Sequence, residues 1–463
     1  MNPAQAELPP FVAQGDPSAV PMSAWLALAT LVMLELALLT DRELLVLLTD
    51  PIKHALSASD LQIGLLQGVG VGVVGAVAGY PLGWLADRHD RRLILAGCVL
   101  VWAVTLLASA LAPSFAWLFV TSSLSTLGFA GLMPVSYSII PALFSGAQRQ
   151  LANSVVSIAG NLGRGIVVVA CGGLIHAVGV LQPQLPAALQ SLDVWRVALL
   201  LALLPLPLML LGIARLPLAA RRAAPVASQT PGGSSEAPAA PVSMAQFLGQ
   251  HRRAFIGLFG GMTVAVLAFS PLFVWLPVSV MRSFGDTPAQ TGAAMGAASI
   301  VAALAGVGIA VFVLPRMQRR FGEAMPINVV IGSTSVAVVT TLALLAAQSA
   351  QQVYITMGVQ LSFMMAAIMV FPTMLQDIAP TTLRGRMAAL LGMVTTVGTA
   401  LGPPLVGVIS DQLALSGHAD ALLLAVVALG AVGFSLAGGL FWSARHPFAI
   451  AVADARRIDA GAA

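Results

Sequence analysis

Four ionisable residues lie in an apolar segment near the start of the chain. The segment covers residues 31–48 and reads LVMLELALLTDRELLVLL, so its ionisable residues are Glu35, Asp41, Arg42 and Glu43. A charged side chain near the centre of a bilayer costs at least about 2.5 to 3.5 kcal/mol, so such residues face a cavity or a partner and mark function. We therefore expect this segment to bind protons or a charged solute.

The helical period decides which of these side chains face the same way. Glu35 and Arg42 project from nearly the same face, whereas Asp41 and Glu43 lie about 100° to either side of Arg42. Glu43 is the weakest candidate, because it is nearest to the expected outer interface. Arg164 lies in the middle of a later apolar run. Two interpretations stay open for it: a structural pair with Asp41 or a glutamate, or a shared site for substrate or protons.

The second half of the chain has no comparable cluster of charges. We select Phe363 and Met364 there as contacts for a substrate. Further interior candidates are Phe273, Trp275, Gln360, Thr395 and Thr399. Taken singly, such residues usually serve packing. If they line a cavity opposite the charged helix, one wall is charged and the other apolar, which suits an amphipathic solute.

The composition is that of a membrane protein. Of the 463 residues, 58% are hydrophobic and only 9% are charged, whereas about a quarter of the residues in soluble domains are charged. Several apolar runs reach the roughly 20 residues that a helix needs to cross the hydrocarbon core. Hydropathy and turn residues predict twelve spans, at 23–49, 60–86, 92–112, 114–141, 150–178, 193–215, 252–282, 287–315, 323–348, 351–376, 384–411 and 420–443.

The twelve spans divide into two halves of nearly equal length, which indicates an internal duplication. The predicted fold is an all-α membrane protein, with twelve transmembrane helices in two pseudo-symmetric six-helix bundles at 23–215 and 252–443. A flexible cytoplasmic linker rich in Ala, Pro, Ser and Gly joins the bundles over 216–251. Cytoplasmic tails are expected at 1–22 and 444–463.

The basic residues indicate the orientation of these spans. Placing both termini and the linker in the cytoplasm leaves only five of the 22 Lys and Arg residues elsewhere: Arg42, Lys53, Arg164, Arg196 and Arg282. This distribution follows the positive-inside rule. We expect a multi-pass protein of a bacterial inner membrane with both termini cytoplasmic. The net charge of +4 then reflects topology, and no nucleic-acid partner is expected.

The loop between the second and third spans carries a distinctive motif, which reads GWLADRHDRR from Gly83 to Arg92. The glycine permits close helix approach, the aspartate can face a neighbouring helix N-terminus, and the arginines can bind carbonyls or lipid phosphates. A plain positive-inside anchor would explain the charges but not their spacing. The motif resembles the signature loop of the major facilitator superfamily, which steadies the outward-facing state. This resemblance implies a conformational latch formed by Gly83, Asp87, Arg88, Arg91 and Arg92.

A narrower resemblance concerns the first half. It resembles the spinster family in four segments: TDRELL, PIKHALSASDLQIGLLQG, YPLGWLADRHDRR and DVWRVALL. Vertebrate members of this family move sphingosine-1-phosphate and lysophospholipids, so the resemblance implies a lipid-like substrate. Spinster-like proteins commonly carry an Arg and, seven residues later, a Glu in span four, where this chain has Ser122 and Phe129. Glu35 and Arg164 are the residues that would compensate for this loss.

These features predict a secondary active transporter that moves an amphipathic, lipid-like small molecule by rocking two bundles about a central cavity. Proton coupling stays open, and the alternative is a proton-coupled multidrug efflux antiporter. A channel would need a selectivity ring or filter, and the sequence shows none.

Other classes of activity are not expected. The sequence has no G-x-x-x-x-G-K-[ST] motif, and its six His residues are scattered without metal-ligand or catalytic spacing. We expect no enzyme activity, no catalytic residue, no cofactor and no metal. The expected partners are the amphipathic substrate, protons and membrane lipids, and we expect a monomer.

Overall fold

The computed structural model describes residues 21–184, 186–217 and 243–461. Most of the predicted tail at 1–22 and of the predicted linker at 216–251 lies outside these residues. The regular secondary structure of the described residues is helical, as predicted.

In the described part of the first half, the α-helices are α1 (Met22–Leu47), α2 (Thr49–Leu56), α3 (Asp60–Leu65), α4 (Val71–Arg88), α5 (Arg91–Ala110), α6 (Phe115–Leu143), α7 (Gly146–Leu181), α8 (Ala187–Gln190), α9 (Val194–Leu201) and α10 (Leu206–Ala214). The π-helical turn η1 (Leu66–Gly70) joins α3 to α4 as one span. The α9 and α10 helices also form one span, which is interrupted near Pro205 because proline donates no backbone hydrogen bond.

In the described part of the second half, the α-helices are α11 (Met244–Gln250), α12 (Arg252–Phe255), α13 (Gly261–Phe284), α14 (Pro288–Gly308), α15 (Leu314–Phe321), α16 (Met325–Ala343), α17 (Ala350–Ile378), α18 (Arg384–Leu415) and α19 (Ala421–Gly461). The π-helical turns η3 (Ile256–Gly260) and η4 (Ile309–Val313) join α12 to α13 and α14 to α15. Among the described residues, twelve helical stretches are long and apolar enough to cross a membrane, which is the number predicted.

The segment after residue 443 is part of α19, which continues as one helix to Gly461. Its last turns pack against the second half through polar contacts. His251 lies 3.4 Å from an oxygen of Asp454. Thr381 donates its backbone N–H and its hydroxyl to Asp459, both at 3.0 Å. These contacts attach the end of α19 to the residue between α11 and α12 and to the turn before α18.

Two helices at corresponding positions of the halves begin with the same capping motif. Ser59 and Gln62 form a capping box at the start of α3, as the sequence predicts. Thr287 and Gln290 form a second capping box at the start of α14. The repetition of this local structure fits an internal duplication.

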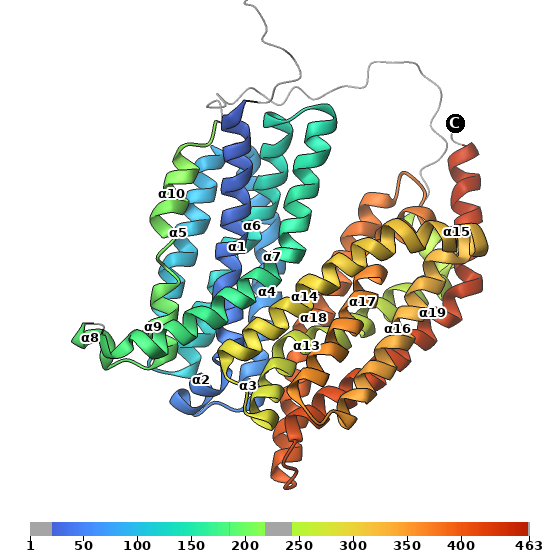
Figure 1. The fold of residues 1–463 in the computed structure, drawn as a ribbon. Helices are drawn as coiled ribbons and strands as arrows, with labels where there is room; N and C mark the ends of the chain where they lie inside the picture. The colour runs from blue at the N-terminus through green and yellow to red at the C-terminus, as the bar shows by residue number, and fades with distance from the viewer. Residues whose placement is uncertain (1–20, 185, 218–242, 462–463) are drawn as a thin grey trace, which may run out of the picture.

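The two halves form separate bundles that converge at one end and diverge at the other (Figure 1). We call the converging end, with α2, the start of α3 and the ends of α13 and α18, the closed end. The other end is the separated end; it carries the start of α1, the end of α4, α15 and the end of α19 (Figure 1). The bundles touch mainly where α7 packs on α14 and where α3, η1 and α4 pack on α18.

Glycines allow these two seams to close to backbone contact. A Cβ atom added to Gly407 of α18 would lie 2.4 Å from the carbonyl oxygen of Asp60 in α3. In the other seam, a Cβ atom added to Gly292 of α14 would lie 2.9 Å from the carbonyl oxygen of Val168 in α7. Any larger residue at these positions would push the halves apart.

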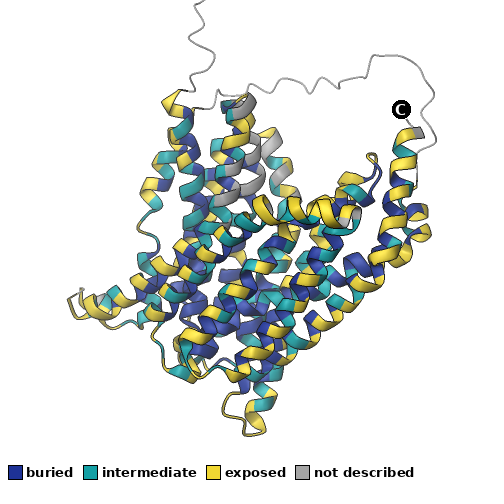
Figure 2. Ribbon diagram, turned by 45° about the vertical axis from the view of Figure 1, so that its right-hand side comes forward, coloured by how far each residue is buried: buried dark blue, intermediate teal, exposed yellow. Residues whose placement is uncertain are grey.

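Burial follows the bundle arrangement. Buried residues gather inside each bundle and where the bundles meet, whereas exposed residues cover the outer helix faces (Figure 2). Many of the exposed side chains are large and apolar, including Val77, Leu93, Val104, Val301 and Trp442. Such faces suit contact with lipid tails.

Candidate functional site

Two of the charged residues of α1, Asp41 and Arg42, contact α6. Asp41 is buried and accepts a 2.6 Å hydrogen bond from the Ser125 hydroxyl. Arg42 donates to the Thr126 hydroxyl at 3.5 Å, and its guanidinium lies 5.3 Å from the centroid of the Phe129 ring. Phe129 stands where the spinster resemblance leads one to expect a glutamate, so an aromatic ring takes the place of a countercharge beneath Arg42.

Arg164 of α7 forms an ion pair with Glu43 of α1. Its Nε atom lies 2.7 Å from Oε1 of Glu43, and the side chains are 36% and 6% exposed. The same guanidinium lies 4.2 Å from the centroid of the Phe273 ring in α13, which belongs to the other half. The sequence left open whether Arg164 pairs with Asp41 or with a glutamate. In the structure its partner is a glutamate, Glu43, which was the weakest candidate for a substrate or proton site.

Glu35 is buried against the backbone of α7. A Cβ atom added to Gly160 would lie 2.8 Å from Oε1 of Glu35, so the glycine leaves room for the carboxylate. Among the described residues, no Lys, Arg or His forms a salt bridge with Glu35, which distinguishes it from Glu43. Gly160 lies one helical turn before Arg164. Glu35 and Glu43 of α1 therefore contact the same face of α7.

Arg164 faces a cavity of about 240 Å³ between the two halves. The first half contributes Gly160 and Arg164 of α7, and the second half contributes the remaining lining residues: Phe269, Phe273, Ser299, Ala302, Ala303, Leu361 and Met365. The cavity thus has a cationic side on one bundle and an apolar side on the other.

A smaller apolar pocket of about 50 Å³ lies within the second half. Phe269 lines both this pocket and the larger cavity, so the two adjoin. Met364 is 6% exposed and lines the smaller pocket, as do Phe371 and Phe441. Phe363 is 39% exposed and is not among the described residues that line either space. The structure therefore separates two residues that sequence reasoning grouped together.

The predicted latch lies at the separated end. Arg88 packs its guanidinium 4.2 Å from the centroid of the Trp84 ring. Arg92 donates to the backbone carbonyl of Leu216, which lies just after α10. Asp90 caps α5 by accepting the Arg92 N–H at 2.9 Å. The helix α4 includes Gly83 and Asp87, but the side-chain environment of these two residues lies outside what the structure describes.

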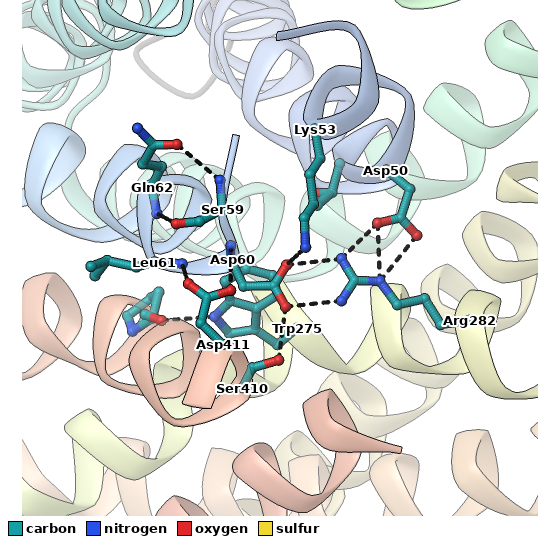
Figure 3. A network of polar contacts seen from close by, with 12 residues as sticks. Asp50, Lys53, Ser59, Asp60, Leu61, Gln62, Trp275, Arg282, Ser410 and Asp411 are labelled. Atoms are coloured by element: carbon teal, nitrogen blue, oxygen red, sulfur yellow. Dashed lines mark hydrogen bonds and ion pairs between the residues drawn. The ribbon is translucent and has the colours of Figure 1, made fainter. Parts of the chain in front are cut away.

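A network at the closed end was not singled out from the sequence. Arg282 at the end of α13 binds the Asp60 carboxylate through two hydrogen bonds of 3.0 Å (Figure 3). It also binds Asp50 of α2, at 2.7 to 3.2 Å. Lys53 adds a 2.6 Å ion pair to Asp60. Lys53 and Arg282 were two of the five basic residues outside the segments predicted to be cytoplasmic, which was the signal available in the sequence.

The same network includes a cap that crosses between the halves. The two carboxylate oxygens of Asp411 in α18 accept the backbone N–H groups of Asp60 and Leu61 at 3.0 and 2.9 Å (Figure 3). These are the first N–H groups of α3, which have no partner within their own helix. Ser410 donates to the Asp60 carboxylate at 2.7 Å. The second half therefore completes the N-terminus of a helix in the first half.

Two six-helix bundles that meet at one end and line a charged cavity between them are an architecture of membrane transporters built from two repeats. The chain belongs to the Major Facilitator Superfamily, whose family model matches residues 30–403. Within this superfamily the chain is similar to spinster proteins. It is therefore an integral membrane transporter and not an enzyme.

Known proteins agree with this assignment. An MFS-type efflux pump of Mycolicibacterium smegmatis is 27% identical over 429 residues, which cover 89% of this chain and 91% of that protein. Protein spinster homolog 1 of Xenopus laevis is 27% identical over 386 residues, which cover 78% of this chain and 68% of that protein. The fold also matches a crystal structure of a bacterial homolog of the human lysosomal transporter Spinster in an inward-facing and unoccupied conformation. The TM-score is 0.75 at 19% identity, and the match covers 94% of this chain and 99% of that chain. The predicted fold is confirmed.

Proposed function

We propose that the protein is a secondary active transporter for an amphipathic, lipid-like small molecule with an anionic head. The observation that carries this proposal is the cavity beside Arg164, which adjoins an apolar pocket through Phe269. A head group would bind at Arg164, and a tail would extend along Phe269 towards Met364. The spinster resemblance of the first half supports the same class of substrate.

The chemistry of Arg164 favours an anion. A guanidinium binds phosphate or carboxylate through two parallel hydrogen bonds and stays charged in a protein. The ring of Phe273 holds it in place from the other half. Arg42 is a second candidate for the head group, because its partners are the hydroxyl of Thr126 and the ring of Phe129.

The difference between the two ends of the molecule supports an alternating-access mechanism. With both termini and the linker in the cytoplasm, the closed end faces outward, so this conformation is inward-facing. We propose that the bundles at 23–215 and 252–443 rock against each other, breaking the closed-end network. In the outward-facing state the separated end closes, and the loop of Gly83, Asp87, Arg88, Arg91 and Arg92 acts as the latch. The protein would work as a monomer in a bacterial inner membrane.

A second candidate function is proton-coupled efflux of hydrophobic cations. The similarity to a mycobacterial efflux pump favours it, as does the buried Glu35 carboxylate, which has no salt bridge to a described residue. In this case Glu35 or Asp41 would hold the ligand, and protonation of the carboxylate would release it.

Ligand-induced thermal stabilisation of the purified full-length protein tests the choice between these functions. The screen would include lysolipids, sphingoid phosphates and cationic dyes. We expect anionic lysolipids and sphingoid phosphates to raise the melting temperature. Stabilisation by the dyes alone would reject the anionic substrate in favour of efflux.

Ligand affinities measured in four variants then test which charged residues bind the substrate. Arg42→Lys and Arg164→Lys should weaken the binding of an anionic lysolipid, at Arg164 by about tenfold or more, because lysine cannot form the two parallel bonds. Glu35→Gln and Asp41→Asn should leave the affinity for the anionic lysolipid unchanged. If the protein is instead an efflux antiporter, these two variants should weaken the binding of a cationic dye. Unchanged affinity for both ligands in all four variants would refute a binding role for the charged residues of α1 and α7.

A further inference from the structure

Glu43 is the carboxylate that holds Arg164, and it is almost completely buried. Its side chain is 6% exposed, and Arg164 is the described cation in contact with it. Asp41 and Arg42 neighbour it on α1, and the thiol of Cys171 on α7 lies within range of its charge. Arg42 is the other cation that interacts with Glu43, but it interacts more strongly with its neighbour Asp41. Loss of Arg164 as a partner would therefore leave the charge of Glu43 only partly compensated.

Arg164 is poised to change partners. Its Nε atom approaches Glu43 to 2.7 Å, but the Nε–H does not point at a hydrogen-bond acceptor. A guanidinium has five N–H donors. The side chain is 36% exposed and lines the cavity of about 240 Å³ between the halves. An anion in this cavity can therefore reach donors that Glu43 does not satisfy.

We propose that Glu43 is the coupling carboxylate of this transporter: an anionic group of the substrate displaces it from Arg164, and the freed carboxylate takes up one proton from water. An O–H bond forms on Glu43 as an O–H bond of a hydronium ion in the solvent breaks, the buffer replaces that proton, and no covalent bond of the substrate changes. This inference rests on the proposed transport of an anionic amphiphile and adds the residue through which substrate and proton binding are linked.

The physical reason is the cost of an unpaired charge. A buried carboxylate that loses its cation is strongly disfavoured, and protonation removes that charge. Substrate binding therefore favours proton binding at Glu43, and by reciprocity the proton favours the substrate by the same factor. Affinity for a permanent anion should then weaken as pH rises, by up to tenfold per pH unit where one proton is taken up per ligand.

Calorimetry on the full-length protein in lipid nanodiscs tests this linkage. The probe is decanesulfonate, an anionic amphiphile that stays ionised throughout the working range, so any proton taken up belongs to the protein. Titrations at one pH in two buffers of different ionisation enthalpy give the number of protons bound per ligand. We expect close to one proton in the wild type at a pH where the affinity changes most steeply.

The variant Glu43→Gln keeps a polar partner for Arg164 but cannot bind the proton. We expect proton uptake to fall to about zero and the affinity to become independent of pH. A matched control is Asp193→Asn, since Asp193 is an exposed carboxylate that pairs with Arg196 outside the cavity. This control should take up as many protons as the wild type. Retention of folding in all variants is checked by their melting temperatures.

The outcomes separate this inference from the proposed function. Binding of decanesulfonate without proton uptake in the wild type would overturn the role of Glu43 and leave anionic transport standing. Uptake that persists in Glu43→Gln but disappears in Glu35→Gln or Asp41→Asn would likewise overturn it and assign coupling to another carboxylate of α1. A wild type that binds no decanesulfonate but binds dodecyltrimethylammonium would overturn both proposals.

Discussion

Arg282 of α13 and Asp60 of α3 form two parallel hydrogen bonds of 3.0 Å, although 222 residues separate them in the chain. The two residues belong to opposite halves and meet at the closed end (Figure 3). Asp60 also binds Lys53 and Ser410, so several bonds converge on one carboxylate. To open the closed end, the hydrogen bonds from Arg282 and Ser410 to Asp60, which join the two halves, must break.

The first prediction is that Arg282→Gln shifts the protein towards the state with its closed end open. Losing one partner of a hydrogen-bonded charge pair destabilises the state that contains it, and we expect a shift of about tenfold, or roughly 1.4 kcal/mol. Spin labels on cysteines at the exposed positions Ala55 and Ser416 would report the change in distance. The two native cysteines are buried.

Arg196→Gln provides the control for this variant. Arg196 also binds an aspartate and backbone carbonyls, but all of these partners lie in the first half. Its loss should leave the distance distribution between the labels as in the wild type. Identical distributions in Arg282→Gln and the wild type would contradict the role of the closed-end network.

The second prediction concerns the glycine seam. Gly407→Ala would place a methyl group 2.4 Å from the Asp60 carbonyl oxygen, which is too close for a backbone contact. We expect this variant to open the closed end and to reduce the inward-facing population measured with the same labels. In Gly392→Ala on the same helix, the added methyl group meets no described atom of a neighbouring element within 4 Å, so this variant should leave the populations unchanged. Equal effects of both substitutions would indicate a helix-propensity effect instead.

The third prediction concerns the latch. Asp87→Asn should reduce the transport rate while leaving the melting temperature unchanged, because it removes a charge expected to pair at the separated end in the outward-facing state. Arg91→Ala and Arg92→Ala should each have a milder effect, since each leaves a basic neighbour. Counterflow of labelled substrate in proteoliposomes measures the rate. A normal rate in Asp87→Asn would reject the latch assignment.

The fourth prediction concerns the tail of the substrate. Met364→Ala should weaken long-chain ligands more than short ones, because Met364 lines the apolar pocket that adjoins the main cavity. Each methylene of a buried tail contributes about 0.8 kcal/mol to binding. In Met364→Ala the affinity should therefore rise less with each added methylene once the tail is long enough to reach the pocket. Phe363→Ala should have a smaller effect, since Phe363 lies outside both spaces. Equal loss for all chain lengths in Met364→Ala would point to a general packing defect.

Much of the architecture was predictable from local sequence. The twelve apolar runs, the capping box of Ser59 and Gln62, and the distribution of basic residues are properties of short segments, and each predicts local structure or topology by itself. The spacing within GWLADRHDRR indicated the superfamily before any contact was known. The charged residues of α1 could also be recognised, because a bilayer makes any charge in a long apolar run conspicuous.

Amino-acid order by itself thus determined the twelve spans, the class of transporter and the helix that carries its charges. The partners of those charges were decided only by the tertiary structure: Arg164 pairs with Glu43 and contacts Phe273, Glu35 lies against Gly160, and Met364 but not Phe363 reaches a pocket. The physical reason is that helical period fixes the direction of a side chain around its own axis, whereas the rotation, tilt and depth of neighbouring helices depend on packing across the whole bundle. The bond from Arg282 to Asp60 joins segments whose proximity exists only once both halves have folded and docked.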